Sequence, residues 1–511
     1  MSDWTAGYMA DIEYTFGYYS ELNPLRMQLA FLHAGLVFPS VGTACELGFG
    51  QGVSANLHAA ASVTAWHGTD FNPAQAAFAQ EMAAAAQSGA CWYDEAFAAF
   101  AARADLPDFD FIALHGIWSW ISDENRAVIV DFVRRKLKVG GVLYISYNTL
   151  PGWAAFAPMR HLMAEHAQVI AAQGQGVLGR VNGALEFAEK LLATNPLYAR
   201  ANPQVVERVK KVRDQNRHYV AHEYFNRDWH PMHFATMADW LAPAKVGYAC
   251  SAHYMDHVDG INLRSEQQAF LVGLPDPMFR ESVRDFMVNQ QFRRDYWVKG
   301  ARRLDAFARV AALRQQKLML VTHRPDVSLK VTGALGEASM SEAIYNPILD
   351  LLADHQPRTL GQIEEGVKGR DITFAQLVQA ALVLVGTGTL APVQDEAAIA
   401  QAKKRTDKLN TFLVNKARGN GDVPYLASPV TAGGVAVGRF QQLFLLAGAQ
   451  GRKQPADMAR FAWQFLAAQG QKIVRDGKTL ETADDNLAEL TERAEGFVAK
   501  QLPILKALRI A

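Results

Sequence analysis

The sequence predicts an α/β fold in its first third, in which a parallel sheet is covered by helices on both faces. Between residues 41 and 151, short apolar runs alternate with helical stretches, the pattern of successive strand–helix–strand units. Alternating glycines follow the first apolar run, and an acidic residue follows the second. Both features therefore lie at the carboxyl ends of predicted strands, where sheets of this kind bind ligands.

We expect strands at 41–47, 64–68, 109–114 and 141–147. Between them, the stretches 73–87 and 125–137 carry apolar residues three and four positions apart. This spacing is typical of helices that pack on a sheet. Each strand should therefore be joined to the next by a right-handed helical crossover.

The pattern changes after residue 154 to long amphipathic helices, for example 155–172 and 177–193. Farther on, three short helical stretches end in a Gly-Thr-Gly-Thr run, which resembles a winged helix. We expect the last part of the chain to be mostly helical and to pack on that segment. The predicted organisation is a sheet domain at 1–154, a helical domain at 155–335, a winged-helix-like segment at 336–395 and a helical region at 396–511.

Composition excludes several classes of partner. Lys plus Arg and Asp plus Glu both number 51, so no overall field attracts nucleic acid or an anionic membrane. The first 15 residues lack the basic and apolar regions of a secretory signal, and no apolar run approaches the roughly 20 residues of a membrane span. The three cysteines, Cys45, Cys91 and Cys250, are widely spaced, as expected for buried thiols in a reducing compartment. We expect a cytoplasmic location.

The glycine-rich turn contains Glu46, Gly48, Phe49, Gly50 and Gly52. Glycine allows a sharp turn with positive φ and leaves no Cβ in the path of a ligand. Dinucleotide-binding turns carry their third glycine one position later, where this chain has Val53. The spacing therefore favours another nucleoside ligand over a dinucleotide.

Asp70 strengthens this interpretation. It follows the second predicted strand, 18 residues after Gly52, and Phe71 comes next. A carboxylate at this position can accept hydrogen bonds from both hydroxyls of a ribose.

These residues resemble the bacterial class I S-adenosylmethionine-dependent methyltransferases that carry a methyltransferase regulatory domain, among them protein-lysine methyltransferases acting on outer-membrane proteins. The likeness continues through 114–120, 144–153 and 221–224, and more weakly through 426–429 and 439–444. It implies a Rossmann-like domain followed by a regulatory domain that covers the active site. Phe49 is bulkier than the residue in many relatives, and the segment 14–38 aligns only loosely.

The resemblance implies S-adenosyl-L-methionine as the cofactor. On the matching positions, the cofactor-binding residues would be Glu46, Gly48, Phe49, Gly50, Gly52, Asp70 and Phe71.

His115 follows the predicted strand at 109–114, beside the crevice where the methyl acceptor is expected. The run from Leu114 to Trp118 lacks the Asn/Asp-Pro-Pro and Pro-Cys patterns of DNA methyltransferases, which disfavours a nucleobase acceptor. Tyr147 ends another strand, and we expect it to line the same pocket. Aromatic rings such as Trp118, and less so Trp120, could desolvate a lysine amine and stabilise cationic groups.

Glu223, from the regulatory domain, is the candidate for orienting the amine or removing its proton through water. A polar network at a domain interface is the alternative role for this residue. Histidines gather between 218 and 257, but they lack the second His of a zincin motif, so we expect no metal. The segment 340–393 has three basic and six acidic residues, which disfavours binding to nucleic acid.

The sequence thus predicts transfer of methyl groups to lysine side chains of a bacterial protein, which could be a surface or exported protein met before export. A methyltransferase acting on small molecules or glycans is one alternative. A catalytically silent regulatory protein that binds the cofactor is another. A homodimer is compatible with the extra domains.

Overall fold

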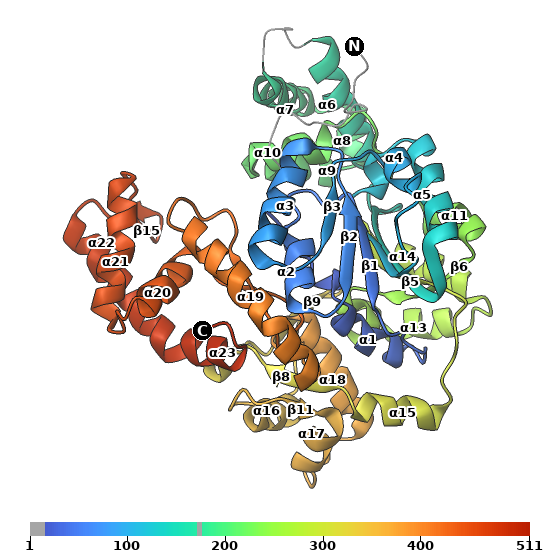
Figure 1. Cartoon of the computed structure of the whole chain (residues 1–511). Helices are drawn as coiled ribbons and strands as arrows, with labels where there is room; N and C mark the ends of the chain where they lie inside the picture. The colour runs from blue at the N-terminus through green and yellow to red at the C-terminus, as the bar shows by residue number, and fades with distance from the viewer. Residues whose placement is uncertain (1–15, 171–175) are drawn as a thin grey trace.

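A seven-stranded sheet forms the centre of the computed structural model, which describes residues 16–170 and 176–511 (Figure 1). Its strand order is β3-β2-β1-β4-β5-β7-β6. The parallel strands from the first part of the chain are β1 (Thr43–Leu47), β2 (Ala65–Thr69), β3 (Cys91–Tyr93), β4 (Phe109–Leu114) and β5 (Leu137–Asn148). The predicted α/β fold is confirmed, and so are its four expected strands; β3 is a short additional strand. Residues 1–15, within the predicted domain 1–154, lie outside the described part.

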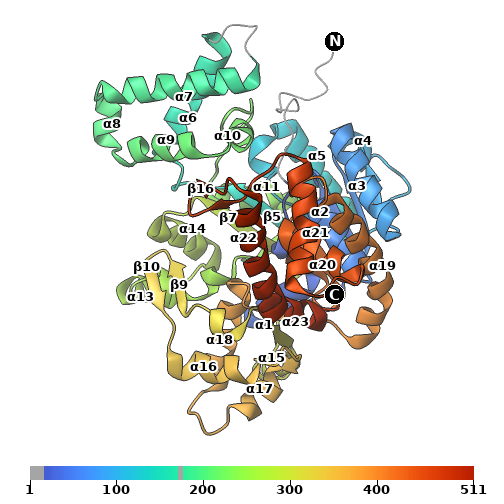
Figure 2. The same cartoon turned by 90° about the vertical axis from the view of Figure 1, so that its left-hand side faces the viewer.

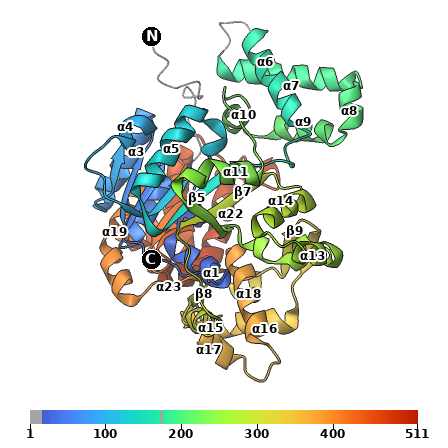
Figure 3. The ribbon, with the colours of Figure 1, turned by 90° about the vertical axis from the view of Figure 1, so that its right-hand side faces the viewer.

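Helices cover both faces of the sheet. One face carries α1 (Pro24–His33), α2 (Val53–Ala61) and α3 (Pro73–Ala86). The other carries α4 (Phe97–Ala101), α5 (Asp123–Lys136) and α11 (Phe234–Leu241), of which α5 and α11 are seen in Figure 3. The helices expected at 73–87 and 125–137 are α3 and α5.

The predicted boundary at residue 154 does not divide the sheet. Strand β7 (Phe292–Lys299) pairs antiparallel with β5 along its buried half, and β6 (Val246–Ser251) pairs with β7. The predicted helical domain thus supplies two strands, because β5 would otherwise expose its hydrogen-bonding edge.

The helices between β5 and β6 form a bundle with its own apolar core, which projects from one end of the sheet (Figure 2). The bundle consists of α6 (Ala157–Val169), α7 (Val177–Ala193), α8 (Leu197–Ala201), α9 (Gln204–Asp214) and α10 (Arg217–Tyr224), whereas α11, which also precedes β6, packs on the sheet. The helix expected at 177–193 has the predicted bounds. The end of the helix expected at 155–172 falls on residues 171–172, outside the described part.

A connecting region follows, with helices α12 (Asp259–Asn262), α13 (Ser265–Val272), α14 (Pro277–Val288) and α15 (Ala306–Arg314) and the hairpin β9 (Lys330–Gly333) and β10 (Gly336–Ser339).

The segment predicted at 336–395 contains the three expected helices, α16 (Glu342–Leu351), α17 (Leu360–Gly366) and α18 (Phe374–Gly386). Its strands β11 (Arg358–Thr359) and β12 (Leu390–Pro392) both pair with β8 (Lys317–Leu320), so this unit begins earlier than predicted. Its winged-helix likeness stays a prediction.

The last region is mostly helical, as predicted. It contains α19 (Glu396–Lys416), α20 (Arg439–Ala449), α21 (Pro455–Ala468), α22 (Ala483–Gly496), α23 (Leu502–Ala507) and the hairpins β13 (Tyr425–Ser428)–β14 (Gly433–Ala436) and β15 (Val474–Arg475)–β16 (Lys478–Thr479).

The prediction that this region packs on the winged-helix-like segment is wrong for its larger core. Leu409 and Leu413 of α19 share a core with α2 and α3, whereas a smaller cluster around Met319 and Ile399 joins the region to the preceding segment. All nine residues of α2 are buried, so this helix needs cover on the side away from the sheet as well. Among the described helices, none is long and apolar enough to cross a membrane.

Candidate active site

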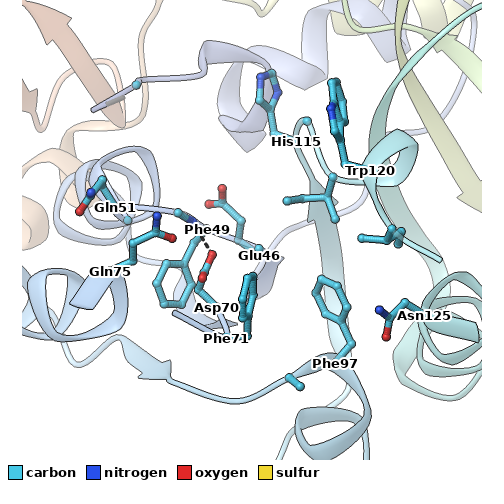
Figure 4. A pocket seen from close by; sticks show the side chains of 18 of the residues that line it. Glu46, Phe49, Gln51, Asp70, Phe71, Gln75, Phe97, His115, Trp120 and Asn125 are labelled. Carbon is cyan, nitrogen blue, oxygen red and sulfur yellow. Dashed lines mark hydrogen bonds between the residues drawn. The ribbon is translucent and has the colours of Figure 1, made fainter. Parts of the chain in front are cut away.

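A cavity opens at the carboxyl ends of β1, β2 and β4 (Figure 4). Its lining comes from the segment before α1, the glycine-rich turn, the ends of β2, β3 and β4 with the first turns of α3 and α5, and Asp228 between α10 and α11. The polar and aromatic lining residues are Tyr19, Glu46, Phe49, Gln51, Asp70, Phe71, Gln75, Glu95, Phe97, His115, Trp120, Ser122, Asn125 and Asp228.

The turn requires its glycines. Gly48, Gly50 and Gly52 have φ values of 75°, 58° and 67°, in the left-handed region that favours glycine. A Cβ on Gly52 would stand 2.5 Å from the Cβ of Ala79, and one on Gly48 would stand 2.5 Å from Cδ1 of Ile117. The turn can therefore lie close to both α3 and the cavity only without side chains at these positions.

Asp70 ties the turn to the end of β2. Its Oδ2 accepts a hydrogen bond from the Gly50 amide at 2.8 Å, and its Oδ1 accepts one from the Asn72 amide at 3.0 Å. Burial raises the pKa of Asp70 to about 6, although both hydrogen bonds oppose this shift. The carboxylate is therefore largely ionised at pH 7 and faces the cavity with its remaining acceptor capacity.

Glu46 is a buried carboxyl group with one oxygen that has no hydrogen-bond partner among the described residues. Its side chain is 2% exposed, and this oxygen is Oε2. Burial, and secondarily the charge of Asp70, raise its pKa to about 8. An unpaired buried oxygen on a cavity wall is suited to a cationic or hydrogen-bond-donating guest, which fits the ammonium of the cofactor's methionine part.

All seven residues predicted to bind the cofactor line this one cavity. His115, predicted at the acceptor end, also lines it.

His115 is held by two tyrosines. Its Nδ1 lies 2.8 Å from the Tyr144 hydroxyl, and its ring stacks on Tyr19 with centroids 3.6 Å apart. Burial lowers the pKa of His115 to about 4 despite the nearby charge of Glu21. The imidazole is therefore neutral at physiological pH and can offer only one N–H.

The expected position of Tyr147 is wrong. This side chain is fully buried on the opposite face of the sheet, where its hydroxyl donates to Asp295 Oδ2 at 2.9 Å. Side chains alternate along a strand, so Tyr144 and Ser146 point toward His115 and Gly116 while Tyr147 points away. The residue of β5 that contacts the site is Tyr144.

Trp118 does not line the cavity either. Its ring is fully buried, with Nε1 at 3.3 Å from the sulfur of Met232, so it belongs to the core beneath α11. Trp120, two residues on, does line the cavity.

Glu223 lies on α10, outside the lining but within electrostatic range of Tyr19, whose pKa it helps to raise. Burial raises the pKa of Glu223 itself to about 7. From this part of the chain it is Asp228, between α10 and α11, that lines the cavity.

Among the polar and aromatic lining residues, sequence reasoning missed Tyr19, Gln51, Gln75, Glu95, Phe97, Ser122, Asn125 and Asp228, and it also missed Tyr144, which contacts His115. Gln51 lies within the glycine-rich turn, and Tyr144 lies within the stretch 144–153 that carries the family resemblance, so the sequence held a local signal for both. Tyr19 and Asp228 reach the cavity only through tertiary folding. Within the described residues, no cluster of three His, Cys, Asp or Glu side chains is arranged to hold a metal ion.

Residues 216–299, from the start of α10 to the end of β7, match the family model described as a predicted methyltransferase regulatory domain. An uncharacterized protein of Synechocystis sp. is 41% identical over 513 residues, which cover 99% of this chain and 100% of that protein. An uncharacterized protein of Rickettsia prowazekii is 26% identical over 36% of this chain and 33% of its own length.

Among solved structures, PKMT2 from Rickettsia typhi in complex with AdoHcy superimposes with a TM-score of 0.71 at 17% identity, covering 97% of this chain and 99% of that chain. A second structure of PKMT2 from Rickettsia typhi superimposes with a TM-score of 0.66 at 17% identity, over 96% of this chain and 98% of that chain. These likenesses extend the shared fold over nearly all of the chain.

Proposed function

Because the chain belongs to the class I methyltransferases that carry a methyltransferase regulatory domain, we propose that it transfers the methyl group of S-adenosylmethionine to lysine side chains of a bacterial protein. The observation that carries the choice of acceptor is the charge of the cavity. Four carboxyl groups line it, on Glu46, Asp70, Glu95 and Asp228, and its described lining includes neither Lys nor Arg. Glu46 is mostly protonated at pH 7 because its pKa is about 8, so the negative charge at that pH comes from the other three.

This charge favours cationic guests. Glu95 is paired with Arg103 at 2.7 Å, whereas neither Glu46 nor Asp70 has an ion pair among the described residues. A buried carboxylate without a partner is costly, and a bound cation removes that cost. Glu46 and Asp70 are assigned to the cofactor below, which is itself cationic. The carboxylates left for the acceptor are Glu95 and Asp228, and their charge favours a cationic lysine over an anionic acceptor.

Aromatic rings support the same choice. Tyr19, Phe49, Phe71, Phe97 and Trp120 all line the cavity. The faces of such rings attract cations, and their bulk excludes water from an amine that must lose its proton.

Glu223 is the proposed proton acceptor, acting through water. A lysine ammonium has a pKa of about 10.4 and must be deprotonated before its nitrogen can react. With a pKa of about 7, Glu223 is poised to take up a proton at neutral pH. His115, neutral and fixed by Tyr144, is proposed to orient the amine.

S-adenosylmethionine, when bound, supplies a methyl group activated by its sulfonium. Asp70 is the proposed partner of its ribose hydroxyls, Glu46 that of its ammonium, and Gly48, Gly50 and Gly52 leave room for it. Phe49 and Phe71 are proposed to pack against it. The chain's own contribution is to bind, orient and desolvate the two reactants.

The parts outside the sheet favour a macromolecular acceptor. The α6–α10 bundle has its own apolar core and projects away from the sheet (Figure 2). A small acceptor would need only the cavity. A surface or exported protein met before export remains the proposed class of substrate.

Incubation with isotope-labelled S-adenosylmethionine and lysate of the host organism, followed by peptide mass spectrometry, tests the proposal. We expect label on lysine side chains of one or a few proteins, and none with the Asp70→Ala variant. Label only in small molecules or glycans would overturn the lysine assignment. Binding of S-adenosylhomocysteine without any labelled product would instead indicate a silent regulatory protein.

A further inference from the structure

The wall of the cavity that touches His115 is not supplied by the sheet. It is Tyr19, which lies in the segment before α1, and this segment runs between the cavity and the β13–β14 hairpin of the last region. Residues about 400 positions apart in the sequence are therefore neighbours at the active site.

Helix α2 holds the backbone of Tyr19 at both of its polar groups. The Tyr19 amide donates to Ser54 Oγ at 3.2 Å, and the Tyr19 carbonyl oxygen lies 3.2 Å from His58 Nε2. His58 is fully buried, and burial lowers its pKa to about 4. It is therefore neutral and carries a single N–H. Both ring nitrogens face carbonyl oxygens, Nε2 that of Tyr19 at 3.2 Å and Nδ1 that of Ala432 at 3.5 Å, and the shorter contact favours the N–H on Nε2.

The hairpin closes on the same segment from the other side. The ring of Tyr18 packs between His58 and Tyr425, with centroid distances of 5.2 and 5.6 Å. Asn23 Nδ2 donates to the carbonyl oxygen of Thr431 at 2.9 Å.

Two glycines make this contact possible. A Cβ on Gly433 would stand 2.3 Å from the Tyr18 hydroxyl, and one on Gly434 would stand 2.8 Å from Cδ2 of Tyr18 and 2.9 Å from Cδ1 of Leu57. Neither glycine has a positive φ. They are needed here for room, not for backbone conformation.

The opposite end of the segment is fixed independently by the sheet. The Tyr296 hydroxyl donates to the Glu21 carbonyl oxygen at 2.6 Å, and Arg294 pairs with the Glu21 carboxylate at 2.6 Å. The hairpin and α2 therefore decide where Tyr18 and Tyr19 lie, while Glu21 stays anchored.

We propose that the β13–β14 hairpin and His58 are positioning elements of the active site, which act by holding Tyr19 against His115. The last region of the chain then completes the acceptor end of the cavity rather than only covering α2 and α3. The activity part of this inference rests on the proposed methyltransferase function.

Gly434→Ala tests the inference, with Gly496→Ala as its control. Gly496 ends α22 in the same region with helical φ, and nothing lies within 4 Å of the position of its Cβ. We expect Gly434→Ala to lower turnover about tenfold in the wild-type background and by less than about twofold in a Tyr19→Ala background, because coupled residues are not additive. Gly496→Ala should change turnover in neither background. An equal loss in both backgrounds for Gly434→Ala would overturn the proposal.

Hydrogen exchange provides a readout that needs neither cofactor nor activity. In Gly434→Ala, amides of residues 17–23 should exchange faster while those of β4 and β5 keep their protection; unchanged exchange at 17–23 contradicts the proposal. If Gly434→Ala does not fold, Tyr18→Phe removes only the hydroxyl that lies against Gly433 of the hairpin, and both tests apply to it. Absence of any methyl transfer would refute the proposed function and leave the exchange result to decide this inference.

Discussion

Replacing Asp70 by alanine tests the cofactor site most directly. In the proposed complex, this carboxylate accepts hydrogen bonds from ribose hydroxyls, and a hydrogen bond to a charged group contributes ~1.5–3 kcal/mol. Asp70 is 6% exposed, so solvent does not screen these bonds strongly. We expect the dissociation constant of S-adenosylhomocysteine to rise about 10- to 150-fold, since ~1.4 kcal/mol corresponds to a tenfold change.

The same substitution should also lower stability. Alanine leaves the Gly50 amide without the acceptor that now lies at 2.8 Å, and a buried unpaired donor costs ~1–3 kcal/mol. Asp70→Asn keeps an acceptor for this amide but loses the charge. We therefore expect Asp70→Asn to fold nearly as stably as the wild type and still to bind more weakly.

Isothermal titration calorimetry at pH 8 is the appropriate assay, because the pKa of Asp70 is about 6 and the carboxylate is then ionised. Thermal unfolding without ligand gives the stability of each variant. Asp94→Ala removes an exposed carboxylate next to Glu95 at the rim and controls for the change in net charge. A folded Asp70→Ala variant with wild-type affinity would refute the ribose assignment.

Three further predictions concern the same cavity. The affinity of the wild type for S-adenosylhomocysteine should increase as pH rises through about 8, because Glu46 must lose its proton to hold a cationic ligand group. Calorimetry should show a weaker dependence of affinity on pH for Glu46→Gln, and an equal dependence in both proteins would contradict this role. Tyr144→Phe removes the hydroxyl 2.8 Å from His115, so turnover should fall about tenfold with affinity changed less than about threefold; a parallel loss of affinity would argue against an orienting role. Gly52→Ala should lower the free energy of unfolding by ~2 kcal/mol or more in denaturant titration, because the new side chain meets both a positive φ and the side chain of Ala79. The control Gly89→Ala, with φ of 75° and open space around the new Cβ, should lower it by only ~1 kcal/mol. Equal losses would mean that the contact to Ala79 is unimportant.

The sequence was sufficient for the parts of the fold that local patterns encode. Strands β1, β2 and β4 are short apolar runs between turn residues, and the glycine turn with Asp70 is a local motif. The seven residues predicted to bind the cofactor could therefore be placed together from the sequence, and they line one cavity. All seven lie between residues 46 and 71, on β1, the turn that follows it and the end of β2.

Strands β6 and β7 could not be found in this way. Strand β7 carries Arg293 and Asp295, which indicate an exposed segment by residue type. In the structure both are buried, because Arg293 pairs with Asp295 at 2.9 Å and with Asp285 at 2.6 Å. Such compensation depends on residues from another helix, and no periodicity in the strand reveals it.

The error at Tyr147 has the same origin at a smaller scale. Tyr144 and Tyr147 are three positions apart on one strand, so they must point to opposite faces, and only one of them can face the cavity. Which one does so depends on which face α1 and the preceding segment cover, and that segment contributes Tyr19 to the site. A strand motif alone therefore restricts the choice to two tyrosines, and the contact of Tyr19 with His115 decides between them. It follows that loss of the Tyr144 hydroxyl should affect turnover, whereas loss of the Tyr147 hydroxyl should affect only the buried network of Asp295.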